Sequence, residues 1–128
     1  WQAGYEILRK LEGFGGTGFM AKEVLLDYIQ FIPGVADWDT WTPVGPGAVR
    51  GLSRIICNDP YAKVERSEAQ HRLTVIWRRL SPKWAEMWNG QRPLSCHDVQ
   101  FCLCEYDKYE RVRLGEGKMK NKYERRDK

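Results

Sequence analysis

The segment WTPVGPGAVRGLSRII, from Trp41 to Ile56, decides the fold that we predict from the sequence. Gly45 and Gly47 flank Pro46, so the backbone can take positive φ on either side of a residue whose own φ is fixed. This pattern predicts a tight turn with outward-facing amide groups. A helix is predicted to begin directly after the turn, near Ala48.

Two arginines follow the turn on this predicted helix. Arg50 and Arg54 are four residues apart and therefore share one face. The stripe that we predict to be buried contains Val49, Leu52, Ile55 and Ile56. Amide groups, a helix N-terminus and two guanidinium groups together suit a bound phosphate. The arrangement is typical of a helix-hairpin-helix unit that holds a nucleic-acid backbone, although many Gly-Pro-Gly triplets are only turns.

A second glycine-rich segment repeats this logic near the start of the chain. Hydrophobic periodicity predicts a helix over residues 2–11, ended by glycines at 13, 15, 16 and 18, and a strong helix over 19–31. Lys22 is the basic residue in the first turns of the second helix, which makes this a weaker phosphate site. Its inward residues are predicted to be Met20, Val24, Leu25, Tyr28 and Phe31. Trp38 and Trp41 are expected to clamp the following turn onto the core rather than to stack on a base.

Three further helices are predicted in the second half. The first runs from about Ser67 to Leu80, and Ser81-Pro82 then begins a short helix that ends at Trp88. The last runs from Ser95, with Asp98 in a capping-box position, to about Arg111. Its core side is predicted to contain Val99, Cys102, Leu103, Tyr106 and Tyr109, and its remaining surface Asp98, Glu105, Asp107, Lys108 and Arg111. Since no segment predicts a convincing strand, the fold class is all-α, a compact multi-helix domain.

Composition excludes disorder and a membrane span. The chain has 128 residues, 42% of them apolar, which is enough for one domain with a core. No apolar run approaches the roughly 20 residues that cross a bilayer.

The chain begins at Trp1 without a Met, so we expect a piece of a longer intracellular polypeptide, nuclear in a eukaryote and cytoplasmic in a bacterium or phage. We divide it into a helical domain, residues 1–115, and a mobile basic tail, residues 116–128.

Positive charge is concentrated in two places. Residues 118–128 hold six basic residues against two acidic ones and thereby account for the net charge of +4. Residues 50–92 hold nine Lys and Arg against four Asp and Glu, whereas the flanking segments are acidic. This distribution suits a polyanion-binding groove beside an acidic pocket, although a scattered solvated surface would give similar counts.

The four cysteines do not predict a metal site. No CxxC pair occurs, and Cys102 and Cys104 would face different ways on a helix. His71 and His97 complete no recognisable ligand set. We therefore interpret Cys57, Cys96, Cys102 and Cys104 as reduced, mostly buried thiols, and we predict no metal and no cofactor.

Three blocks of the sequence resemble a known family. They are GFGGTGFMAKEVLLD at 13–27, WTPVGPGAVRGLSRI at 41–55 and HDVQFCLCEYDKYERVRLGEGKMKNKY at 97–123. They look like the helical domain of 5-hydroxymethyldeoxyuridine DNA kinases and the related putrescinyl/glutamyl thymine pyrophosphorylases. The resemblance implies a role in hypermodification of thymine in DNA. It also implies a fold similar to that of the helix-hairpin-helix DNA glycosylases.

The resemblance implies roles for two groups of residues. The expected DNA contacts are Gly45, Gly47, Arg50, Gly51 and Arg54, to which the charge pattern adds Lys22, Lys118, Lys120 and Lys122. The expected pocket and candidate catalytic residues are Asp27, Glu105, Asp107 and Lys108. No GxxxxGK[ST] phosphate loop occurs, so the chain cannot by itself be a P-loop kinase.

Our leading hypothesis is a domain that grips the phosphates of double-stranded DNA and presents a modified or flipped pyrimidine to another domain of the same parent chain. One alternative is that the chain is itself a transferase or glycosylase-like enzyme, in which Lys108 serves as nucleophile or phosphate ligand. For each of these candidates a surface salt bridge is the favoured explanation. The other alternative is a helical module that binds an acidic protein or RNA.

Overall fold

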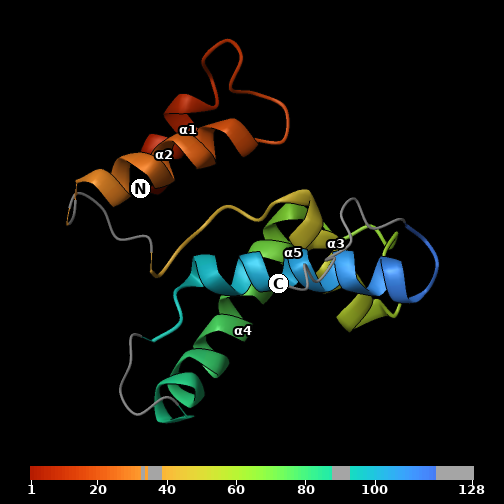
Figure 1. Cartoon of the computed structure of the whole chain (residues 1–128). Helices are drawn as coiled ribbons and strands as arrows, with labels where there is room; N and C mark the ends of the chain where they lie inside the picture. Colours follow the sequence, from red (N-terminus) through yellow and green to blue (C-terminus); the bar gives the residue numbers. More distant parts are fainter. Residues whose placement is uncertain (33, 35–38, 88–92, 118–128) are drawn as a thin grey trace, which may run out of the picture.

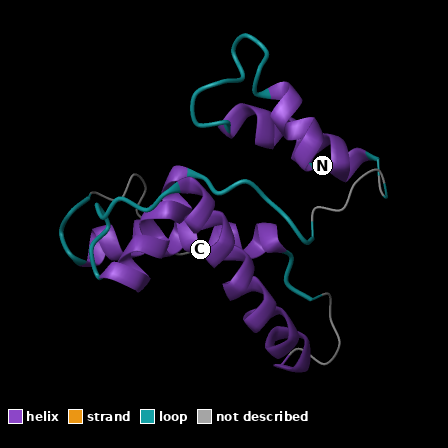
Figure 2. Ribbon diagram, turned by 180° about the vertical axis from the view of Figure 1, so that it is seen from behind, coloured by secondary structure: helices purple, strands orange, loops and turns teal. Residues whose placement is uncertain are grey.

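The computed structural model describes residues 1–32, 34, 39–87 and 93–117. Within this part the chain forms helices and loops and no strand, which confirms the all-α class (Figure 2). The helices are α1 (Gln2–Leu8), α2 (Phe19–Phe31), α3 (Pro46–Cys57), α4 (Arg66–Met87) and α5 (Cys96–Arg113) (Figure 1).

The core lies where α3, α4 and α5 meet. It consists of Val44, Ala48, Leu52, Ala69, Leu73, Cys96, Val99 and Leu103. Helices α1 and α2 pair with each other as a separate hairpin (Figure 1). Trp41 joins the two groups, because its ring packs edge-on against Trp1 and Tyr5 at centroid distances of 5.9 and 5.8 Å. Trp41 was predicted to clamp the following turn onto the core, but it packs instead against Trp1 and Tyr5, which lie outside the core. Trp38 lies outside the described residues.

Helix α3 packs unusually close to α5. A Cβ atom at Gly51 would collide with the carbonyl oxygen of Leu103, and one at Gly47 would lie 3.1 Å from the Sγ atom of Cys104. Ala48, which follows Gly47 in the sequence, is fully buried. The two glycines therefore let the helix backbones approach, which accounts for the GPGAVRG pattern through packing.

The predicted turn around Pro46 is wrong. Gly45 is extended, with φ −83° and ψ 164°, and serves as the N-cap of a helix that already begins at Pro46. The fixed φ of proline suits the first helical position, so Pro46 starts the helix instead of forming a hairpin. Positive φ is found instead at Gly13, Gly16 and Gly18, in the segment between α1 and α2.

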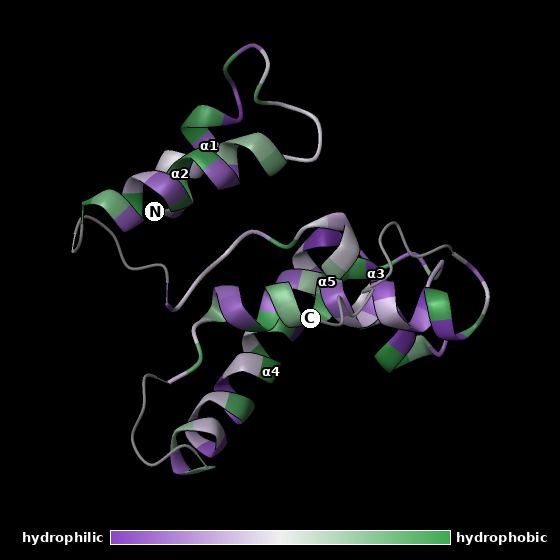
Figure 3. Ribbon diagram, in the orientation of Figure 1, coloured by the Kyte–Doolittle hydropathy of each residue, from purple (hydrophilic) through white to green (hydrophobic). Residues whose placement is uncertain are grey.

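Two predicted apolar faces also differ from the structure. On α2 the buried residues are Ala21, Leu26 and Ile29, whereas Met20, Val24, Tyr28 and Phe31 are exposed. Hydrophobic residues occur on several sides of α2 (Figure 3), so its neighbours, not its periodicity, select the buried face. On α3, Ile55 and Ile56 are exposed because the core contacts lie on the side of Ala48 and Leu52.

In the second half of the chain the helix positions were predicted more closely, but Tyr106 and Tyr109, predicted on the core side of α5, are exposed. Ser95 caps α5 in a capping box with Asp98, as predicted. The two helices expected before it are one helix, α4, which contains Pro82. The side chains of Trp77 and Ser81 donate to the carbonyl oxygen of Leu94 at 2.7 and 2.9 Å, and these bonds hold that part of α4 in place. All four cysteines are free, but Cys57 and Cys102 are exposed, contrary to the expected burial.

Candidate nucleic-acid interface

A groove of about 450 Å³ lies between the N-terminal ends of α2 and α3 and the middle of α5. Its lining includes six residues that the sequence predicted for the site: Lys22, Gly45, Gly47, Arg50, Glu105 and Lys108. These residues come from three helices that are distant in sequence. The fold thus brings together two predicted groups, the glycines and cations on one side and the acidic pocket residues on the other.

The N-terminus of α3 opens into this groove. Gly45 provides no side-chain cap, and Pro46 has no N–H group. Because neither Gly45 nor Gly47 has a side chain, the groove reaches the backbone at this helix end. The positive end of the helix dipole therefore favours a negative group here.

Two lysines line the groove, Lys22 from α2 and Lys108 from α5. Lys22 lies 3.0 Å from Glu23 and its Nζ atom is 5.5 Å from the ring centroid of Phe19. Lys108 lies 2.5 Å from Glu105, and both of these side chains are largely exposed. The exposed Lys108–Glu105 pair contributes about 0–1 kcal/mol, so an incoming phosphate can replace Glu105 at little cost. The side chain of Lys22, in contrast, is only 12% exposed.

The groove also contains aromatic rings and a buried amide. Phe19 and Phe101 are each 57% exposed, although rings of this size are usually buried. Gln100 is buried, and its Nε2 atom donates to the Sγ atom of Cys104 at 3.0 Å. The Oε1 atom of Gln100 makes no hydrogen bond with the described residues. A buried acceptor without a partner is costly, but this atom is closed to solvent as placed in the structure.

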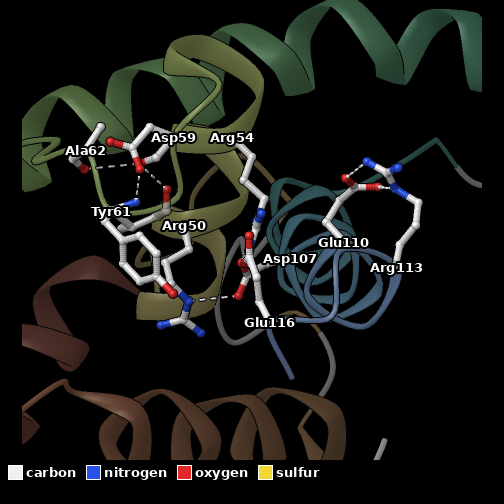
Figure 4. A network of polar contacts seen from close by, with 11 residues as sticks. Arg50, Arg54, Asp59, Tyr61, Ala62, Asp107, Glu110, Arg113 and Glu116 are labelled. Carbon is white, nitrogen blue, oxygen red and sulfur yellow. Dashed lines mark hydrogen bonds and ion pairs between the residues drawn. The ribbon is translucent and has the colours of Figure 1, made fainter. Parts of the chain in front are cut away.

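Behind the groove, Asp107 lies between two arginines (Figure 4). Its Oδ2 atom accepts from Nε of Arg50 at 2.8 Å and its Oδ1 atom from Nε of Arg54 at 3.0 Å. Burial by itself would raise the pKa of this carboxyl, but the hydrogen bonds and charges of Arg50 and Arg54 outweigh burial and lower it. Asp107 was predicted to lie on the surface of α5, and this is wrong, since it is fully buried.

The two arginines differ in what they can still bind. Arg54 also donates to Glu116 at 2.5 Å, and chiefly this bond raises the pKa of Arg54, against the effect of its burial. The side chain of Arg54 is 6% exposed, whereas that of Arg50 is 39% exposed. The terminal nitrogens of Arg50 make no hydrogen bond with the described residues. Arg50 therefore remains able to bind a ligand, while Arg54 is occupied by the two carboxylates.

Other predicted site residues lie elsewhere. Asp27 is exposed on α2 and does not line the groove. Gly51 is buried against α5. Lys118, Lys120 and Lys122 lie outside the described residues. Glu116 was assigned to the tail, yet it contacts Arg54.

Sequence reasoning missed Phe19, Gln100 and Phe101. A signal was present for the buried polar residues of α5. Cys96, Gln100, Leu103 and Asp107 recur at helical spacing, so two polar residues stand on an otherwise apolar stripe. Polar residues on such a stripe are expected to be buried and paired.

One known protein family matches the chain over most of its length. The family described as the helical domain of 5-hmdU DNA kinase matches residues 1–119. The chain belongs to this family, which places it in the context of DNA modification. No curated protein matches it significantly. The same is true of the solved structures. In the described part of the chain, no helix combines the length and apolarity needed to cross a membrane.

Proposed function

We propose that this chain is the DNA-binding domain of an intracellular enzyme that modifies 5-hydroxymethyluracil in double-stranded DNA. In this proposal the groove holds the DNA backbone and receives the modified pyrimidine after it has flipped out of the duplex. The observation that carries the proposal is the convergence of Lys22, Arg50, Lys108 and the uncapped N-terminus of α3 on one groove. The choice of 5-hydroxymethyluracil as the modified base rests on membership of the 5-hmdU DNA kinase family.

Phosphate binding follows from the donors that face the groove. The terminal nitrogens of Arg50 can donate a bidentate pair to a phosphate, while Asp107 holds its Nε atom and so fixes its orientation. Lys22 and Lys108 add point charges from the opposite helices. Contacts of this kind give affinity that depends on salt and hardly on sequence.

Recognition of a pyrimidine would come from Phe19, Phe101 and Gln100. Each exposed ring offers a face on which a base can stack. The Oε1 atom of Gln100 has no partner among the described residues but is closed to solvent, so the side chain would have to turn toward the groove before it could accept from the N3–H group of uracil. Pockets of roughly 300–1,000 Å³ hold small ligands, so a groove of about 450 Å³ is large enough for a flipped base.

Catalysis is assigned to another domain of the parent chain. The sequence contains no GxxxxGK[ST] loop to bind a nucleoside triphosphate in the P-loop manner. Among the candidate catalytic residues, Asp107 is occupied by two arginines, and Glu105 and Lys108 pair with each other on the rim. An exposed pair at i, i+3 is explained by helix surface geometry without chemistry.

The test is fluorescence anisotropy with duplexes that carry either thymine or 5-hydroxymethyluracil, at two salt concentrations. We expect Lys22→Gln, Arg50→Gln and Lys108→Gln each to weaken binding to both duplexes and to reduce the salt slope by about one. Arg113→Gln is the matched control, because Arg113 also lies on α5 but pairs with Glu110 away from the groove.

A second measurement addresses the base. Phe101→Ala should reduce the preference for the modified duplex, while affinity for the thymine duplex changes little. If the chain binds neither duplex, or if Arg113→Gln weakens binding as much as the groove variants, the proposal fails. Absence of DNA binding would then favour a module that binds an acidic protein or RNA.

A further inference from the structure

A second pocket, which we call the arginine pocket, shares Arg50 with the groove. It has a volume of about 250 Å³ and is lined by Arg50, Arg54, Pro60, Tyr61 and Arg111. None of the other four residues lines the groove. The arginine pocket is therefore a separate concavity, and the function proposed above leaves it unused.

The wall of the arginine pocket is formed by the turn after α3. Asn58 ends α3 in the left-handed conformation, with φ 52°, and its N–H donates to the carbonyl of Arg54. The Oδ1 atom of Asp59 then accepts from the N–H of Tyr61 at 2.8 Å. These bonds hold the backbone of Tyr61, while its side chain is 76% exposed. Figure 4 shows the ring of Tyr61 beside the side chain of Arg50.

The charges of the arginine pocket are not balanced. Three guanidinium groups line it, and they meet two carboxylates: Asp107 pairs with both Arg50 and Arg54, and Glu116 pairs with Arg54. The terminal nitrogens of Arg50 and the guanidinium of Arg111 make no hydrogen bond with the described residues. Among the described residues, the guanidinium of Arg111 and the terminal nitrogens of Arg50 are therefore left to attract an anion, and the planar donors of arginine match phosphate oxygens.

The ring of Tyr61 in the arginine pocket indicates which kind of anion would bind there. Tyr61 and Pro60 provide an apolar surface next to the cationic one. Inorganic phosphate would use only the arginines, whereas a nucleotide would use both surfaces, because its base can stack on the tyrosine ring.

We propose that the arginine pocket binds a nucleotide, with its phosphate on Arg50 and Arg111 and its base on the ring of Tyr61. The same chemistry is offered by a free nucleotide and by an unpaired nucleotide within a DNA strand. This site shares Arg50 with the groove, but its contacts with Arg111 and Tyr61 are separate and do not require that the groove binds DNA.

The experiment is isothermal titration calorimetry of the full chain with inorganic phosphate, thymidine monophosphate and a single-stranded oligonucleotide. Arg111→Gln removes one cation, and Tyr61→Leu removes the ring. The matched controls are Arg113→Gln and Tyr109→Leu, since both residues are exposed on α5 and neither lines the arginine pocket.

We expect Arg111→Gln to weaken binding of all three ligands at least about tenfold, as loss of a charged hydrogen bond does. Tyr61→Leu should weaken binding of the two nucleotide ligands at least about fivefold and leave that of phosphate nearly unchanged. If the single-stranded oligonucleotide shows these losses and thymidine monophosphate does not bind, the ligand is a nucleotide within a strand. If thymidine monophosphate shows them, a free nucleotide is sufficient.

The proposal is overturned if neither variant differs from its control with any nucleotide ligand, or if phosphate binding falls equally in Tyr61→Leu. Its failure is separable from failure of the groove, because Lys22→Gln and Lys108→Gln change the groove alone. Tyr61 and Arg111 are exposed, so each variant is expected to fold, which far-UV circular dichroism verifies.

Discussion

Replacing Asp107 by Asn tests whether the buried carboxylate holds α3 and α5 together. In the structure one carboxylate accepts from two arginines on the neighbouring helix, at 2.8 Å from Arg50 and 3.0 Å from Arg54. Asparagine keeps the shape and one acceptor oxygen. Its amide group, however, would face one of the two guanidinium groups as a second donor.

The expected loss of stability follows from the burial of each partner. Breaking a buried ion pair by removing one partner costs about 3–5 kcal/mol. That range applies to Arg54, whose side chain is 6% exposed, but Arg54 retains Glu116 and the remaining oxygen of asparagine. The side chain of Arg50 is 39% exposed, so solvent screens its bond to Asp107, which adds about 1 kcal/mol or less. We therefore expect Asp107→Asn to lower the free energy of unfolding by about 3 kcal/mol.

Urea unfolding at neutral pH, followed by far-UV circular dichroism, measures this loss. The matched control is Glu105→Gln on the same helix, because Glu105 forms an exposed pair with Lys108 and should contribute less than about 0.5 kcal/mol. A loss in Asp107→Asn below about 1 kcal/mol, or one equal to that of the control, would refute the reasoning.

The same comparison has a defined pH dependence. Because the arginines hold the pKa of Asp107 below the ordinary value of 3.8, its carboxylate contributes stability that is fully present above that pH. This contribution is lost as the pH falls through the lowered pKa of the folded state. The difference between wild type and Asp107→Asn should therefore be constant near neutral pH and shrink below about pH 4. A difference that grows in acid would contradict the assignment.

Three further outcomes are expected. Gly51→Ala should destabilise the chain by about 1–3 kcal/mol in urea unfolding, because the new methyl group pushes α3 away from α5. This loss is expected although alanine has the better helix propensity. Unchanged stability would show that the two helices can move apart freely. Ser95→Ala should cost about 1 kcal/mol in the same assay through loss of the capping box with Asp98, and a neutral effect would show that water replaces the cap. Iodoacetamide at neutral pH should modify exposed Cys57 much faster than Cys96, whose pKa burial raises to about 11, and equal rates in peptide mapping would contradict the burial of Cys96.

Much of the local structure could be predicted because it depends on neighbouring residues. The capping box at Ser95 and the range of α2 follow from short-range hydrogen bonds and helical periodicity. The buried face of α2 could not be predicted in this way, since Met20 and Val24 are as apolar as Leu26 and Ile29. Contacts with other segments decide between such faces.

For the candidate site, too, some features follow from the sequence and others depend on contacts between helices. The sequence by itself determined the all-α class, the capped start of α5 and the presence of Arg50 and Arg54 on one helix. Only the tertiary structure decided that Arg54 pairs with both Asp107 and Glu116, whereas Arg50 bonds Asp107 through Nε alone among the described residues. The reason is that both arginines pair with Asp107, a residue on a different helix, and the fraction of each side chain left in solvent depends on how α3 and α5 pack.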